Sequence, residues 1–203
     1  MTATTTPNVE LPHAAAARPW GRIACAAAAL GTVPVFALGA LTGDTGGEVT
    51  AGLADDSVTL ITCSILAVMV SAGLFLAAAR LGRVIGGDAA PLVTLAGGAL
   101  ALMYAAYYSV FGAGGIVASQ MLTDPGPGLG EAASLLLNVM EVARYAPGLA
   151  LVAAVLAAGA RLPRWVRATA GILVVMTLVP FTSWMAALLI PLWLGASAAV
   201  LRD

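Results

Sequence analysis

The polar residues most able to do chemistry lie together in one otherwise apolar stretch of the sequence. Between residues 134 and 148 the chain carries Asn138, Glu141, Arg144 and Tyr145 among leucines, valines and alanines. At about 100° per residue of an α-helix, these side chains fall within an arc of about 120° and form one polar stripe. Glu141 and Arg144 are three residues apart, so their carboxylate and guanidinium can form an ion pair along the helix surface.

The preceding apolar stretch carries a matching aromatic face. Three tyrosines and a phenylalanine fall within about 100° of helical arc: Tyr104, Tyr107, Tyr108 and Phe111. The tyrosines are too deep in the stretch for an interfacial aromatic belt, so their hydroxyl groups need hydrogen-bond partners. We expect Glu141 and Arg144 on the antiparallel neighbouring helix to be those partners. Three small residues nearby are expected to let another helix approach closely: Gly112, Gly114 and Gly115.

This cluster has more than one interpretation. An ionised group at mid-bilayer costs at least about 2.5–3.5 kcal/mol, so the polar stripe must face the bundle interior or a water-filled cavity. The cluster can line an outward-opening pocket, in which Arg144 holds an anionic headgroup and the rings hold the apolar body of a small amphipathic ligand. It can instead be a closed network that fixes helix packing, or it can contact a partner membrane subunit. The candidate ligand-binding residues are Tyr104, Tyr107, Tyr108, Asn138, Glu141, Arg144 and Tyr145.

Several kinds of chemistry lack their usual residues. The one histidine, His13, lies in the N-terminal tail, away from any site that could use it as a metal ligand or as the base of a serine nucleophile. Cys25 and Cys63 differ in predicted depth by roughly 10–20 Å, which is too far for a disulfide bond. We therefore predict no catalytic residue, no metal and no cofactor. An enzyme that acts on lipid, with Glu141 as acid or base, ranks third behind a binding or transport protein and a structural subunit.

Composition defines the broad class of protein. Of the 203 residues, 61% are hydrophobic and 9% are charged, and the mean hydropathy is +0.98. Soluble domains carry roughly 25% charged residues, so this chain has too few charged residues to cover the surface of a water-soluble domain. The net charge of −1 also excludes a nucleic-acid binder that depends on a basic face. The sequence indicates an integral membrane protein, with membrane lipid as its surroundings.

The apolar stretches predict an all-α, polytopic transmembrane helical bundle. Spans of about 20 residues are expected at 23–41, 58–79, 92–115 and 135–158. The remaining apolar tail is interrupted by Pro180 and predicts two shorter helices at about 165–179 and 184–201. The chain then has six spans, with five as the alternative. Residues 1–19 are expected to be a disordered tail, and residues 20–203 a single membrane domain.

The arginines predict an orientation. Apart from Arg144, every arginine falls on one side of a six-span topology, whereas the acidic connections at 42–57 and 116–134 fall on the other. By the positive-inside rule both termini are then cytoplasmic, in the inner, cytoplasmic membrane of the cell. The first span also has features of a signal peptide, and its cleavage would leave five spans.

The alanine- and arginine-rich composition, the span layout and the Pro191-Leu-Trp-Leu-Gly195 segment together resemble those of small six-span proteins of unknown function found in high-GC bacteria. That resemblance implies a bacterial integral membrane protein. It supplies no catalytic or binding residues.

Overall fold

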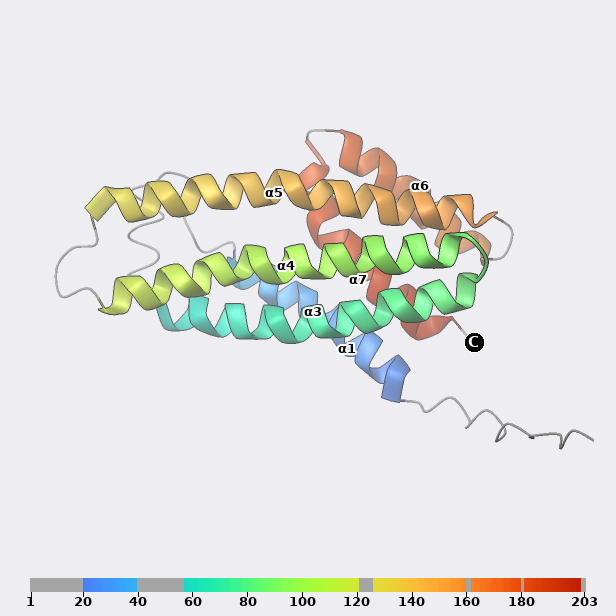
Figure 1. Ribbon diagram of the computed structural model, residues 1–203, viewed down its shortest axis with the longest axis horizontal. Helices are drawn as coiled ribbons and strands as arrows, with labels where there is room; N and C mark the ends of the chain where they lie inside the picture. The colour runs from blue at the N-terminus through green and yellow to red at the C-terminus, as the bar shows by residue number, and fades with distance from the viewer. Residues whose placement is uncertain (1–19, 40–56, 121–125, 160–161, 180, 202–203) are drawn as a thin grey trace, which may run out of the picture.

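The computed structural model describes residues 20–39, 57–120, 126–159, 162–179 and 181–201, and within these ranges the chain is helical and has no strand. The helices in order are α1 (Trp20–Gly39), α3 (Ser57–Ile85), α4 (Ala89–Gln120), α5 (Gly126–Ala157), α6 (Arg164–Leu178) and α7 (Ser183–Val200) (Figure 1). The prediction of an all-α chain is confirmed for this part of the sequence. The tail predicted to be disordered, residues 1–19, lies outside the described residues.

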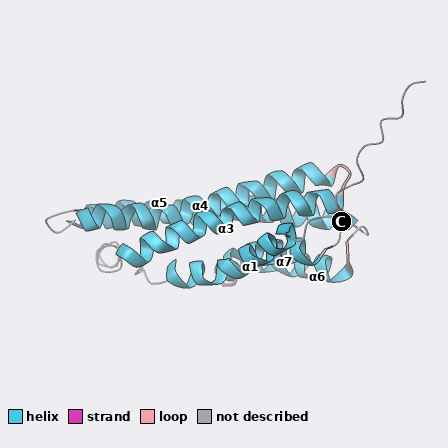
Figure 2. Cartoon of the chain, turned by 90° about the horizontal axis from the view of Figure 1, so that it is seen from below, coloured by secondary structure: helices cyan, strands magenta, loops and turns pink. Residues whose placement is uncertain are grey.

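The helices form two layers of unequal length (Figure 2). One layer contains α3, α4 and α5, which have 29, 32 and 32 residues. The other contains α1, α6 and α7, which have 20, 15 and 18 residues. The long layer therefore extends past the short one at the end where α5 begins, on the left of both views.

Five of the described helices are long and apolar enough to cross a membrane, namely α1, α3, α4, α5 and α7. With 15 residues, α6 is about 22 Å long, against about 30 Å for the hydrocarbon core of a bilayer. The long helices extend beyond the predicted spans, because a helix continues cheaply into flanking residues once it has nucleated. The start of α5 shows this, since it includes Pro127 and Gly128, which the sequence places in a connection. Proline is tolerated in a first helical turn because its missing N–H would have no intrahelical partner there.

Small residues bring α3 and α4 into close contact. A Cβ atom added to Gly112 would lie 2.5 Å from the Cβ of Ser64, and one added to Gly115 would lie 3.1 Å from the backbone oxygen of Ser57. The predicted close approach of another helix at Gly112 and Gly115 is therefore confirmed. Gly114 instead lines a groove on the surface between α4 and α5.

Five of the described arginines lie at one end of the bundle, at the start of α1, the end of α3 and the start of α6: Arg22, Arg80, Arg83, Arg164 and Arg167. We call this the arginine-rich end. The Nε of Arg80 donates to the backbone oxygen of Ala198 at 2.8 Å, and its Nη2 donates to that of Leu201 at 3.2 Å. The last carbonyl groups of a helix lack intrahelical donors, so Arg80 stabilises the end of α7 by supplying them.

Candidate functional site

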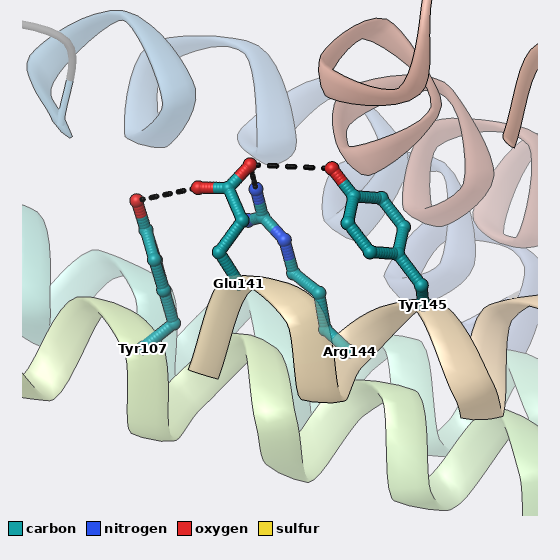
Figure 3. Close-up of polar contacts among 4 residues, drawn as sticks. All are labelled: Tyr107, Glu141, Arg144 and Tyr145. Atoms are coloured by element: carbon teal, nitrogen blue, oxygen red, sulfur yellow. Dashed lines mark hydrogen bonds and ion pairs between the residues drawn. The ribbon is translucent and has the colours of Figure 1, made fainter. Parts of the chain in front are cut away.

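Glu141 is the centre of a polar cluster between α4 and α5 (Figure 3). The Nη2 of Arg144 lies 2.9 Å from Oε1 of Glu141. The hydroxyl of Tyr145 donates to the same oxygen at 3.3 Å, and the hydroxyl of Tyr107, from α4, donates to Oε2 at 3.4 Å. Both carboxylate oxygens therefore accept hydrogen bonds, and the cluster contains the ion pair expected from the sequence spacing.

The periodicity of α5 explains how this cluster forms. Residues three and four apart share a helix face, so Arg144 and Tyr145 both reach back to the carboxylate of Glu141. Tyr107 reaches the same carboxylate because α4 packs beside α5 and runs in the opposite direction. In Figure 3 the four side chains point toward the side on which α1 and the C-terminal helices lie.

Arg144 is the buried member of the ion pair. Its side chain is 7% exposed, and its Cζ lies 4.5 Å from the ring centroid of Tyr107, a cation–π distance. Its Nε is buried and has no hydrogen-bond partner among the described residues. The guanidinium is thus neutralised on one side and faces an aromatic ring, while the described residues leave its buried Nε without an acceptor.

The other two predicted tyrosines belong to an aromatic group next to the cluster. Tyr104 donates its hydroxyl to the backbone oxygen of Thr32 on α1 at 3.3 Å, not to the ion pair. Its ring lies 4.9 Å from that of Tyr108, which in turn lies 5.1 Å from that of Tyr107, centroid to centroid. Both Tyr104 and Tyr108 are buried. The expectation that all three hydroxyls bond to Glu141 or Arg144 is therefore wrong for Tyr104, whose recorded acceptor is on α1.

Asn138 lies on the same stripe of α5 but makes a separate contact. Its Nδ2 donates to the backbone oxygen of Ser134 at 2.9 Å, one turn earlier in its own helix, and its side chain is exposed. Short polar side chains often bond to their own helix in this way. The structure therefore does not join Asn138 to the cluster.

Glu141 lies at the level where the hairpin of α6 and α7 ends. Gly148 on α5 packs against Ile190 on α7, and both helices run toward the arginine-rich end. Counting back seven residues on each helix places Glu141 at the level of Ser183, the first residue of α7. Beyond that level α5 continues for about 22 Å without the hairpin beside it. This position explains why the Glu141 side chain is 32% exposed although its partner Arg144 is buried.

The space on the inner side of Arg144 is small. A cavity of about 10 Å³ is lined by Tyr104, Arg144 and Tyr145 on one side and by α7 on the other, through Ala186 and Ile190 among others. That volume is at the threshold for a single water molecule. Among the described residues, the cluster is therefore open on the side of Glu141 and closed on the inner side of Arg144.

Some residues that contact the site from α1 and α7 could not be identified from the sequence. Thr32 supplies a backbone acceptor, and Ala186 with Ala187 lets α7 lie against Arg144 and Tyr145. Alanines on a membrane helix are too common to be informative alone. A backbone acceptor also leaves no signal in the side-chain sequence.

The cluster is made of charged groups and hydrogen-bonding groups. It offers a carboxylate, a guanidinium and two phenolic hydroxyls, while the described residues contain no group of three or more His, Cys, Asp or Glu side chains placed to hold a metal ion. Cys25 and Cys63 are both buried and free, and the thiol of Cys63 donates to the backbone oxygen of Val35 at 3.4 Å. Comparison of the chain with family models, with curated proteins and with solved structures finds no match.

Proposed function

We propose that this integral membrane protein binds the polar headgroup of a small amphipathic molecule at Glu141 and Arg144, in order to transport or sense it. The observation that carries the proposal is the unequal burial of the ion pair, with Arg144 at 7% and Glu141 at 32% exposure. A pair that only held helices together would be expected to bury both partners. Hydrogen bonds between transmembrane helices contribute only about 0.6 kcal/mol on average, so an ion pair is an inefficient way to fix packing.

The geometry suggests how a headgroup would bind. A headgroup that approaches from the exposed side of Glu141 would donate a hydrogen bond to its carboxylate, and an anionic oxygen of the same headgroup would accept from Nη2 of Arg144. The hydroxyls of Tyr107 and Tyr145 would remain available as donors. The apolar part of the molecule would lie where the hairpin ends, at the level of Glu141, beside the exposed rings of Phe181 and Trp184.

The same proposal places the chain in the cytoplasmic membrane of a bacterium, among small six-span proteins. α6 begins at the arginine-rich end and α7 ends there, so we count these two antiparallel helices as the fifth and sixth crossings. Local thinning of the bilayer and the interfacial rings of Trp165 and Trp184 would compensate for the length of α6. The positive-inside rule then makes the arginine-rich end, and both termini, cytoplasmic.

A structural or regulatory subunit is the second candidate, and one observation favours it. The cavity beside Arg144 has room for no more than a water molecule, and both oxygens of Glu141 already have partners. In that case the cluster would stabilise the bundle, and the chain would act through a partner membrane subunit.

Native mass spectrometry of the full chain in mild detergent tests the proposal. The wild type should retain a small molecule, and Glu141→Gln should lose it while folding normally. Asn138→Ala is the matched control, because Asn138 lies one turn away on the same stripe and, among the described residues, bonds only to its own helix. A wild type that carries no small molecule that Glu141→Gln loses would contradict a binding site at Glu141.

A further inference from the structure

A long apolar groove lies between α3 and α4 on the face of the long layer turned away from α1. It has a volume of about 780 Å³, within the range of about 300–1,000 Å³ for small-molecule sites. Its walls include four large, exposed side chains, Phe75, Leu76, Leu95 and Leu102. α3 contacts α1 through Gly73, on the opposite side of the helix. None of the described helices therefore covers this groove.

The length of the groove matches one leaflet of a bilayer. Along α4 it runs from Thr94 to Ala105, which is about 16 Å at 1.5 Å per residue. The hydrocarbon core is about 30 Å thick, so the groove occupies about half of it. It lies in the half toward the arginine-rich end, because α4 begins at that end and Thr94 is near its start. A transmembrane helix of a partner would need a surface that spans both leaflets, whereas one lipid chain needs only this half.

A positive charge lies in line with the groove. Arg83 is exposed and seven residues beyond Leu76, so it is on the same face of α3 and about 10 Å further toward the arginine-rich end. The described residues at that end contain five arginines and one acid, Asp88. An arginine near a membrane surface attracts anionic lipid by about 1 kcal/mol.

We propose that the groove holds one acyl chain of an anionic phospholipid from the leaflet at the arginine-rich end, with the lipid phosphate at Arg83. The apolar walls accept the chain, and the guanidinium of Arg83 selects the headgroup. The site is separate from the Glu141 cluster, which faces the other layer, so it does not depend on the function proposed there.

Lipid competition measured by native mass spectrometry tests this site. The full chain is purified, delipidated and incubated with equal amounts of palmitoyl-oleoyl phosphatidylglycerol and phosphatidylcholine. The wild type should retain one phosphatidylglycerol with about fivefold preference, which corresponds to about 1 kcal/mol. Arg83→Gln should remove the preference without preventing lipid retention.

Variants that fill the groove test the position of the acyl chain. Ala72→Phe and Ala99→Phe place a ring in the groove from either helix, at exposed positions where the core has no need to rearrange. Each should reduce retention of both lipids severalfold. Ala150→Phe, at an exposed position of α5 outside the groove, is the matched control and should retain lipid like the wild type.

Four outcomes would overturn the proposal. Equal retention by the wild type, Ala72→Phe and Ala99→Phe would remove the acyl chain from the groove, and an unchanged preference in Arg83→Gln would remove the phosphate from Arg83. If the wild type were a dimer and either Phe variant a monomer, the groove would be assigned to a second copy of the chain.

Ser71 lines the groove with a buried hydroxyl that has no partner among the described residues. Because an acyl chain cannot bond to it, loss of lipid in Ser71→Ala would point instead to a ligand with a polar group at that depth.

Discussion

Two arginines are buried to the same degree, each 6% exposed as a whole residue, and they lie in contrasting surroundings. Arg80 lies at the arginine-rich end and donates to two backbone carbonyls at the end of α7. Arg144 lies deep in α5 and pairs with a side chain, Glu141, while its Nε is left without a hydrogen bond to the described residues. The same residue type thus stabilises a helix end in one region and is the buried member of a partly exposed ion pair in the other.

The contrast separates a structural contact from a candidate site. Backbone carbonyls at a helix end are fixed and cannot be exchanged for a ligand, so Arg80 has the features of a permanent cap. The carboxylate beside Arg144 is a side-chain group and is one-third exposed, so under the proposed function a headgroup can reach it. Removing each arginine should therefore affect stability and binding differently.

Arg80→Leu is expected to have the largest effect on stability. It removes two hydrogen bonds from a charged donor, each worth about 1.5–3 kcal/mol, so the free energy of unfolding should fall by about 3 kcal/mol or more. Chemical unfolding in detergent measures the change. Arg22→Leu removes only the exposed bond from Arg22 to the backbone oxygen of Ala199 and should cost less than half as much. Unchanged stability in Arg80→Leu would show that α7 does not need this cap.

Arg144→Leu should have the next largest effect. It leaves the carboxylate of Glu141 unpaired, at a cost of up to about 2.5–3.5 kcal/mol in a membrane. Because Glu141 is one-third exposed, we expect about 2 kcal/mol instead. The double variant Glu141→Leu/Arg144→Leu should recover most of the loss, and a double-mutant cycle gives the coupling energy. Additive effects would show that the two residues do not interact.

Tyr107→Phe should have a smaller effect. It removes the hydrogen bond to Glu141 and keeps the ring next to Arg144, so the loss should be about 0.6 kcal/mol. Tyr107→Leu also removes the cation–π contact and should cost about 0.5–1 kcal/mol more. Unfolding of the two variants under the same conditions separates the hydroxyl from the ring. Equal stability of the two would count against the cation–π contact.

Asn138→Ala should have the smallest effect, within about 0.5 kcal/mol of the wild type. Asn138 is exposed, and within the described part of the chain it bonds only to the backbone of its own helix. The variant should also retain the same small molecule as the wild type. Loss of that molecule would show that Asn138 belongs to the binding site, together with the other residues of the polar stripe.

The sequence predicts the helices better than it predicts their contacts. Apolar runs locate the long helices because the surface of a membrane helix is apolar both where it faces the bundle core and where it faces lipid. The spacing of Glu141 and Arg144 predicts their pairing because the contact is local to one helix. The partner of Tyr104 could not be predicted, since the backbone oxygen of Thr32 depends on where α1 packs. Likewise, the exposure of Glu141 depends on where the hairpin ends relative to α5, which is a property of the packed bundle.

The most direct test of a binding site at Glu141 is the stability of Glu141→Gln in protein freed of any retained molecule. The amide oxygen in this variant can still accept from Arg144, and the Tyr107 ring remains beside the guanidinium. A binding site predicts a free energy of unfolding within about 1 kcal/mol of the wild type, together with loss of the molecule that the wild type retains. A fall of about 3 kcal/mol or more, as expected when one partner of a buried pair is removed, would show that the pair holds the helices together and would contradict the proposed site.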